Sequence, residues 1–410
     1  MELKTGYKQT EIGVIPSDWD LKSVGEIFTF YSTSNFSKAE MTVFGDVGCV
    51  HYGLIHAIEN SHYSLSEGTK YYVTKEQAKY ETIKEGDVIM VDASEDLVGL
   101  NKSVEVFNLR GKEFIAGLHT FLLRDNSLNY VVKFRGLILN STAVKKQMLK
   151  LAVGMKVFGV SKTQLQNILI SVPPLTEQTL IATALSDADA LISSLEKLIA
   201  KKRNIKQGAM QKLLQPKEGW EVKKLGEVAE IVGGGTPSSF ISSYWNGKIN
   251  WFTPTEIGEN KYTFESARKI TKEGFINCSG KMLPVGSILL TTRAGIGDLS
   301  ILMMEGCTNQ GFQSLIAKEG YYNEYLYYLV QTLKNVLIQN ASGSTFLEIS
   351  PNKIKQIEIS IPSFEEQNEI ATILSDMDEE ITALETKLEK YKKVKLGMMQ
   401  NLLTGKIRLV

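Results

Sequence analysis

The sequence predicts an α+β fold built as a tandem duplication, in which two mixed α/β domains are separated by two long antiparallel coiled-coil helices. Three observations predict it: a repeated helical segment, a looser repeat of the sequence around it, and β-rich runs between the repeats. Residues 172–214 align onto residues 361–403 without a gap, with about twenty identities in about forty-three positions. A single globular domain does not need such a repeat, so the chain is a pseudo-two-fold duplication.

The looser repeat extends the duplication to the whole chain. The segment from Trp19 to Ile27 returns as Trp220 to Val228, which gives a period of about 200 residues. Between these anchors the halves scarcely match. The expected division is a first domain at residues 1–172, with an N-terminal tail at 1–13, and a central helix at 173–215. A second domain follows at 216–361, and a C-terminal helix at 362–410. We expect the tail to return beside the C-terminal residues that begin at Thr404.

The repeated segments are predicted to be helices with a heptad seam. Apolar residues follow alternating steps of four and three, interrupted by lysine, which is the pattern of a coiled coil. In the second copy the seam is Ile370, Leu374, Met377, Ile381, Leu384, Leu388, Tyr391, Lys395, Met398 and Leu402. In the first copy it is Ile181, Leu185, Ala188, Ile192, Leu195, Ile199, Lys202, Lys206, Ala209 and Leu213. About 38 helical residues give a rod of about 55 to 60 Å. Such a rod is also compatible with a structural hairpin or a dimerisation device.

Composition excludes several classes of protein. The formal net charge of the 410 residues is zero, so a polyanion partner must be bound by local patches. The absence of a long apolar run or signal peptide predicts a soluble cytoplasmic protein without membrane contact. The three cysteines are far apart, which argues against a disulfide framework or a thiolate zinc site. His51, His56 and His62 have no metal-binding spacing, so we expect neither a metal nor a cofactor.

Each domain mixes short β-rich runs with an apolar helical segment, and polar loops rich in Gly, Ser and Thr separate them. Hydroxyl, amide and guanidinium groups in such loops can hydrogen-bond base edges and phosphates. Gly-rich turns also close hairpins without binding anything, so each loop has a purely structural interpretation. No phosphate-binding loop, nucleotide-cofactor fingerprint, nucleophile elbow or base-methylation motif is present. We therefore expect no catalysis by this chain itself.

Three sequence features resemble the specificity subunit of type I restriction-modification systems. They are the opening that runs from Tyr7 to Trp19, the helix starts Pro-x-x-x-Glu-Gln-x-x-Ile-Ala-x-x-Leu-Ser-Asp-x-Asp at Pro173 and Pro362, and the Gly-x-Met-Gln-x-Leu-Leu at both helix ends. The order of diverged domain, similar helix, diverged domain, similar helix matches that family over almost the whole chain.

The resemblance implies that the two domains are target-recognition domains, each reading one half of a bipartite sequence in double-stranded DNA. It also implies that the helices set the spacing and dock two methyltransferase subunits, and through them restriction subunits. A coiled-coil adaptor that joins two proteins without touching DNA would explain the duplication equally well. An enzyme with a cryptic active site is a third reading, disfavoured by the absent motifs.

The expected DNA-contacting residues lie in polar loops that correspond between the halves. They are Ser94, Lys102, His119 and Lys156 in the first domain, and Gly234, Thr236, Ser238, Arg293, Asn309, Gln310, Gln313 and Ser344 in the second. The residues expected to bind the methyltransferase lie on the outer faces of the helices: Glu177, Gln178, Asp187, Glu366, Gln367 and Asp376. Because the two domains differ in these loops, their half-sites should differ.

Overall fold

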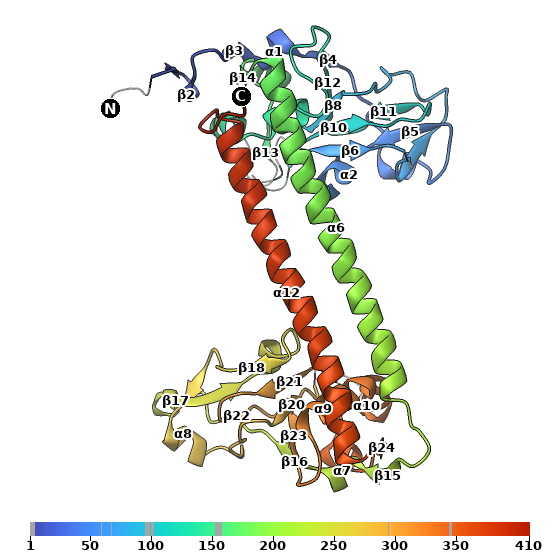
Figure 1. Ribbon diagram of the computed structural model, residues 1–410, viewed down its shortest axis with the longest axis vertical. Coiled ribbons are helices and arrows are strands. Elements are labelled where there is room, and N and C mark those ends of the chain that lie inside the picture. Colours follow the sequence, from blue (N-terminus) through green and yellow to red (C-terminus); the bar gives the residue numbers. More distant parts are fainter. Residues whose placement is uncertain are drawn as a thin grey trace. The chain divides into compact units, whose positions relative to one another are not determined.

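The computed structural model describes residues 5–58, 60–66, 68–94, 99, 102–151, 158–293, 295–343 and 347–410. The chain forms two compact units (Figure 1). Unit 1 contains residues 1–196 and 386–410, and unit 2 contains residues 197–385. Two long helices, α6 (Leu175–Leu213) and α12 (Phe364–Leu402), each contribute one part to either unit.

Unit 1 is built on a five-stranded sheet with the order β4-β12-β8-β10-β6. Its strands are β4 (Thr29–Tyr31), β12 (Thr120–Arg124), β8 (Val88–Val91), β10 (Ser103–Phe107) and β6 (His62–Ser64). A three-stranded sheet has the order β11-β5-β7, from β11 (Phe114–Ala116), β5 (Val47–Val50) and β7 (Tyr71–Val73). Unit 1 also contains three separate antiparallel pairs of short strands. They are β1 (Tyr7–Thr10) with β2 (Gly13–Pro16), β3 (Asp20–Ser23) with β14 (Leu169–Val172), and β9 (Ala93–Ser94) with β13 (Phe158–Gly159).

Short helices lie between the strands in the sequence. They are α1 (Val24–Ile27), η1 (Lys38–Glu40), α2 (Tyr52–Ala57), α3 (Arg135–Leu139), α4 (Thr142–Leu151) and α5 (Lys162–Gln166). The central strand β8 is buried along its whole length and reads Val-Ile-Met-Val. That continuous apolar run is typical of a strand covered on both faces. The main core of the unit gathers Trp19, Phe28, Tyr130 and Phe134 with the starting residues of α6.

Unit 2 repeats this plan with different residues. Its five-stranded sheet has the order β16-β23-β20-β21-β18, from β16 (Ala229–Gly233), β23 (Gln313–Ala317), β20 (Ile288–Leu290), β21 (Leu299–Leu302) and β18 (Tyr262–Thr263). The three-stranded sheet has the order β19-β17-β22, from β19 (Lys269–Ile270), β17 (Trp245–Phe252) and β22 (Gly306–Thr308). β15 (Glu221–Lys224) pairs with β24 (Glu358–Ile361). The helices are α7 (Leu225–Val228), η2 (Ser242–Tyr244), η3 (Pro254–Glu256), α8 (Lys272–Ile276), α9 (Asn323–Thr332), α10 (Lys334–Asn340) and α11 (Pro351–Lys355).

The duplication is therefore visible in the topology, even where the sequences do not match. Both five-stranded sheets have the same connection order, and both end in a parallel pair, β10 with β6 or β21 with β18. Both three-stranded sheets combine one parallel and one antiparallel pair. The predicted fold class of two mixed α/β domains in tandem, with two long helices, is confirmed.

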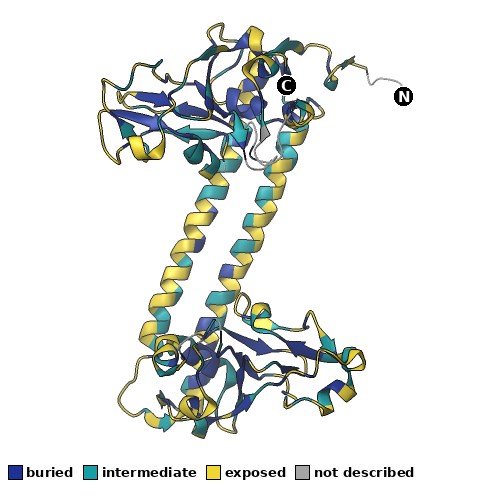
Figure 2. Ribbon diagram, turned by 180° about the vertical axis from the view of Figure 1, so that it is seen from behind, coloured by how far each residue is buried: buried dark blue, intermediate teal, exposed yellow. Residues whose placement is uncertain are grey.

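The predicted heptad seams are confirmed as well. Every seam position is buried or half-buried, whereas most of the remaining helix surface is exposed (Figure 2). In unit 2, Lys202 pairs with Glu380 and Lys206 with Asp378. In unit 1, Asp189 pairs with Lys395. Residue numbers that rise along α6 meet numbers that fall along α12, so the paired stretches within each unit run antiparallel.

The N-terminal tail and the C-terminal end of unit 1 lie together, as expected. The Tyr7 hydroxyl donates a hydrogen bond to the carbonyl of Gly405 over 2.9 Å. Arg408 binds Asp18 through both terminal nitrogens, at 2.9 and 2.7 Å. In unit 2 the equivalent region is one continuous stretch, from the end of α6 at Leu213 to Trp220. In unit 1, segments near the two ends of the sequence are therefore joined by non-covalent contacts. In unit 2 the equivalent segments follow one another in the chain.

Candidate nucleic-acid interface

The polar loops of unit 2 meet at one edge of its five-stranded sheet. β16 ends at Gly233, which pairs with Gln313 at the start of β23. The chain after β20 continues the same edge, because Thr291 forms a bridge with Phe312 and Arg293 with Glu348. Four loops far apart in the sequence are therefore neighbours, as a shared contact surface requires.

Two of these loops are bonded to one another. The Thr236 hydroxyl donates to Gln310 Oε1, and the amide nitrogen of Gly235 donates to the carbonyl of Thr308 over 2.8 Å. Gly234 is required for this approach, since an added Cβ would lie 2.0 Å from the carbonyl oxygen of Asn309. Thr236 and Gln310 are exposed, and so is Ser238 on the same loop. This part of the predicted surface is consistent with contact to a ligand.

Other predicted residues of unit 2 are buried or are engaged by contacts within the unit. Arg293 is half-exposed, with its Nε 2.8 Å from Glu348 Oε1, so its charge is neutralised inside the unit. Asn309 Oδ1 accepts a hydrogen bond from the amide of Gly311 over 2.8 Å, which shapes the loop. Gln313 is 9% exposed, and within the described residues its Oε1 has no hydrogen-bond partner. Gln313 is thus largely covered in this conformation, and its contact with DNA stays a prediction.

Unit 1 places its loops at the equivalent edge. The amide nitrogen of Asp92 donates to the carbonyl of His119 over 3.2 Å, and their side chains form a contact of 3.4 Å. Burial raises the pKa of the Asp92 carboxyl above its ordinary value. His119 is exposed at a backbone φ of 56°, a left-handed conformation at a sharp turn. His119 is thus the predicted residue of this unit that is best placed to meet a ligand.

The remaining predicted residues of unit 1 are buried or half-buried, or lie outside the described residues. Ser94 is 6% exposed within β9, and its contact with DNA stays a prediction. Lys102 donates from Nζ to the carbonyl of His56 over 2.9 Å. Lys156, and Ser344 of the second domain, lie outside the described residues.

His51, one of the histidines near Cys49, has a structural role. His51 is buried and accepts a hydrogen bond at Nδ1 from the amide of Gly53, which caps the start of α2. Burial lowers the pKa of His51 to about 4, so its ring is neutral at physiological pH. In the described part of the chain no group of His, Cys, Asp and Glu side chains could hold a metal ion.

Three of the four residues in the repeated Glu-Gln pairs are buried, so the expectation that the pairs lie on the outer helix faces is wrong for Glu177, Gln178 and Gln367. Glu177 is 1% exposed and accepts hydrogen bonds from Trp19 Nε1 over 2.8 Å and from Arg408 over 2.6 and 2.8 Å. Gln178 is fully buried and bonds the amide of Val131 and the carbonyl of Pro173. These side chains fasten the start of α6 to the domain core.

The second copy repeats these contacts. Glu366 accepts from Trp220 Nε1 over 3.1 Å and from Lys217 over 2.8 Å, so its carboxylate is engaged within unit 2. Gln367 is buried and bonds the amide of Tyr322 and the carbonyl of Pro362. Of the six residues predicted to bind a partner, Asp187 and Asp376 are exposed.

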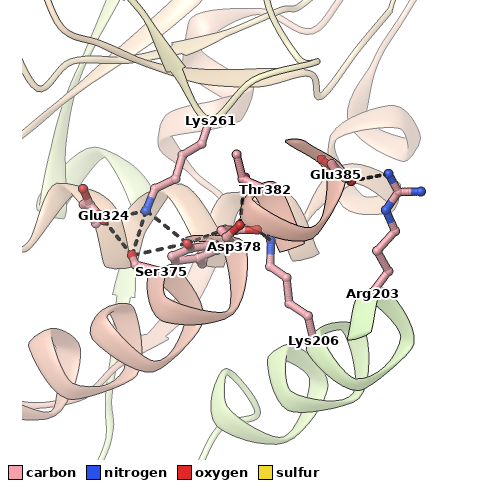
Figure 3. A network of polar contacts seen from close by, with 9 residues as sticks. Arg203, Lys206, Lys261, Glu324, Ser375, Asp378, Thr382 and Glu385 are labelled. Atoms are coloured by element: carbon pink, nitrogen blue, oxygen red, sulfur yellow. Dashed lines mark hydrogen bonds and ion pairs between the residues drawn. The ribbon is translucent and has the colours of Figure 1, made fainter. Parts of the chain in front are cut away.

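The polar interruption of each helix seam is occupied by an ion pair. Lys206 lies 2.5 Å from Asp378, whose carboxylate also accepts from the Tyr328 hydroxyl over 2.6 Å. Figure 3 shows this group continuing to Ser375, Glu324 and Lys261, so the α9 side of unit 2 is joined to α12 by a connected polar network. In unit 1 the corresponding pair is Lys395 with Asp189.

The comparisons with known proteins agree with this duplicated architecture. The family model for the type I restriction modification DNA specificity domain matches twice, at residues 16–207 and 217–394. The chain belongs to this family.

Two relatives come from Methanocaldococcus jannaschii. The type I restriction enzyme MjaIX specificity subunit is 41% identical over 190 residues, a match that spans 45% of this chain and 44% of the relative. The putative MjaX specificity subunit is 28% identical over 98% of this chain and 97% of its own length. The first relative thus resembles one half of the chain, and the second resembles all of it.

Solved structures of this family share the fold. The crystal structure of the HsdS subunit from Thermoanaerobacter tengcongensis matches with a TM-score of 0.52 at 20% identity, over 96% of this chain and 98% of that chain. A chain from a structure concerned with complex assembly of the type I restriction-modification system matches with a TM-score of 0.61 at 19% identity, over 96% and 99%. No helix of this family member, within the described residues, is long and apolar enough to cross a membrane.

Proposed function

We propose that this chain is the DNA sequence-specificity subunit of a type I restriction-modification complex, with each unit reading one half of a bipartite target. The observation that carries the proposal is the double match to the DNA specificity domain, combined with the polar loops that meet at the same sheet edge in both units. Methylation and cleavage are proposed to belong to other subunits, and the chain carries no base-methylation motif.

The chemistry of the two edges supports different half-sites. Unit 1 presents the exposed His119 beside the carboxylate of Asp92. A carboxylate in the major groove can accept from the amino group of cytosine. Unit 2 presents Thr236, Gln310 and the half-exposed Arg293, and amide and guanidinium groups prefer adenine and guanine edges. A subunit with two such edges would read a target whose halves are not copies of one another.

The helices are proposed to fix the separation of the half-sites and to dock the methyltransferase subunits. α6 and α12 each run unbroken for 39 residues, about 58 Å at about 1.5 Å per residue. One turn of DNA is about 34 Å, so a single helix is long enough to span adjacent turns. The exposed carboxylates of Asp187 and Asp376 are the proposed docking contacts for two methyltransferase subunits, which in turn carry restriction subunits.

Docking is tested by charge reversal at these two positions. The double substitution Asp187→Lys and Asp376→Lys should reduce co-purification of the methyltransferase subunit, because each carboxylate becomes a cation at a matching place on its helix. Reversal of Glu389, an exposed acidic residue elsewhere on α12, is the matched control. An unchanged yield of complex from the double variant would exclude this surface.

The function as a whole is tested by co-expressing the chain with the methyltransferase encoded beside it and mapping methylated adenines by single-molecule sequencing of the host DNA. The expected result is two short half-sites separated by a fixed gap. A stable complex that leaves no methylated motif would reject DNA reading and favour an adaptor that joins proteins only.

A further inference from the structure

Unit 2 holds an arginine on an aromatic platform close to the polar loop of residues 233–239. The guanidinium carbon of Arg268 lies 3.9 Å from the centre of the Trp245 ring and 5.1 Å from that of Trp251. The two indoles meet edge to face, with their centres 5.1 Å apart. A cation over an indole face is attracted by the ring quadrupole, so the guanidinium is held in place without a carboxylate.

Hydrogen bonds tie this platform to the predicted DNA-contacting loop. Trp245 Nε1 donates to the carbonyl of Ser238 over 3.1 Å, and Trp251 Nε1 donates to the carbonyl of Gly235 over 2.8 Å. Both acceptors belong to the segment that carries Thr236. Arg268 therefore lies next to a loop whose composition predicts contact with DNA, although the sequence around Arg268 itself does not predict such a contact.

Arg268 has no acidic partner among the described residues. Arg268 is exposed, and among the residues that the structure describes no carboxylate forms an ion pair with it. Nearby carboxylates are engaged elsewhere: Glu265 lies 3.5 Å from Lys269, and Glu256 accepts from the amides of Thr253 and Ala267 over 2.7 and 2.6 Å. Arg293, by contrast, is paired with Glu348.

We propose that Arg268, positioned by Trp245, binds a phosphate of the DNA strand that runs beside the half-site read by unit 2. A guanidinium held on an aromatic face has already lost much of its side-chain freedom, and its planar fork matches the oxygens of a phosphate. The proposal rests on the proposed function and adds a residue that the loop chemistry did not predict.

The contact is specific to unit 2. By strand pairing, Cys49 takes the place of Trp251 in unit 1, and Tyr71 takes the place of Arg268. Unit 1 therefore lacks this platform at the equivalent position, and the removal of Arg268 should leave the reading of the other half-site unchanged.

The test measures the binding of the complex with its methyltransferase subunit to a duplex that carries the mapped target, over a series of salt concentrations. Arg268→Gln should lower the slope of log affinity against log salt by about 0.9, since one phosphate contact is lost. The wild-type advantage over the variant should then shrink about 3.5-fold between 50 and 200 mM salt. Lys334→Gln is the control, because it removes the same charge from a lysine that is paired with Asp298 at 2.9 Å.

A second pair of variants tests the role of the platform. Trp245→Leu keeps the charge of Arg268 but removes its stacking surface, so affinity should fall about threefold while the salt slope stays unchanged. Arg268→Lys should retain the slope as well. Thermal unfolding of each variant checks that unit 2 is folded. The Arg268 variants should keep the melting temperature of the wild type, because this side chain is exposed.

The outcomes separate the inference from the function on which it rests. A wild-type complex that binds no duplex selectively would reject the proposed function. With selective wild-type binding, unchanged affinity and slope in Arg268→Gln would overturn the phosphate contact. So would a loss confined to particular base pairs of one half-site, since that pattern marks a base contact.

Discussion

The ion pair between Lys206 and Asp378 offers the sharpest test of how the helices are held in register. The side chains of Lys206 and Asp378 are 17% and 26% exposed, so neither is fully solvated. Asp378→Ala would leave the Lys206 ammonium without its partner and would also remove the acceptor of the Tyr328 hydroxyl. Burial, followed by the bond to Asp378, raises the pKa of Tyr328 above its ordinary value.

The expected cost follows from these environments. Breaking a fully buried pair costs about 3 to 5 kcal/mol, and the remaining exposure here should reduce this to about 2 kcal/mol. The lost hydroxyl bond adds about 1 kcal/mol. Asp378→Ala should therefore destabilise unit 2 by about 3 kcal/mol. The double variant Lys206→Met with Asp378→Leu should cost less than this single one, because no charge is left unpaired.

Equilibrium urea unfolding of the purified chain, followed by circular dichroism, measures these values, with the transitions of the two units fitted separately. Glu385→Ala is the control on the same helices. The side chains of its pair with Arg203 are 39% and 64% exposed, so its loss should cost less than about 0.5 kcal/mol. A free energy of unfolding that falls no more in Asp378→Ala than in Glu385→Ala would contradict this account. So would a loss in the double variant equal to the sum of the losses in Lys206→Met and Asp378→Leu alone.

Three further predictions concern unit 1 and the DNA edge of unit 2. Burial raises the pKa of Glu105 to about 7. The stability linked to its protonated form is therefore complete below about pH 4.5 and is lost as pH rises through 7. Glu105→Gln should flatten the plot of the free energy of unfolding against pH, and an unaltered plot would contradict this. Arg408→Ala should destabilise unit 1 by about 2 to 3 kcal/mol in urea unfolding, because the buried Glu177 loses its cation; Lys217→Ala, whose partner is more exposed, should cost less. Arg293→Ala should relax base preference in one half-site of the methylation map, whereas a uniform loss across sequences would mark a phosphate contact.

The helical part of the fold was predictable because its signal is local. A seam repeated every seven residues specifies which side of each helix is covered, and all twenty seam positions are buried or half-buried. The sheet orders were not predictable in the same way. β8 lies between β12 and β10, and such a pairing depends on contacts between residues far apart in the sequence, whose apolar runs are interchangeable.

The candidate site was predictable at the level of loops but not of side chains. Loop composition identified residues 233–239 and 309–313, and the structure brings them together. Composition did not indicate that Gln313 turns inward or that Arg293 meets Glu348, because both depend on the tertiary neighbours of one side chain. Arg268 was missed for the same reason, since the signal that marks it is the indole ring beneath it.

The repeat also indicates which residues act within the chain and which act outside it. Glu177 and Glu366 recur because their partners Trp19 and Trp220 recur, so identity between the halves is explained there by internal contacts. In the repeated Leu-Ser-Asp-x-Asp, the second aspartate is likewise used internally, since Asp378 binds Lys206 and Asp189 binds Lys395.

The first aspartate of that motif differs. Asp187 and Asp376 are exposed in both copies, and in the described part of the chain neither forms an ion pair or a side-chain hydrogen bond with another residue. An identical residue that contributes to no internal contact is better explained by an external partner that binds each copy in the same way. The duplication therefore supports a docking role for these two aspartates, and argues against such a role for the buried Glu177, Gln178 and Gln367.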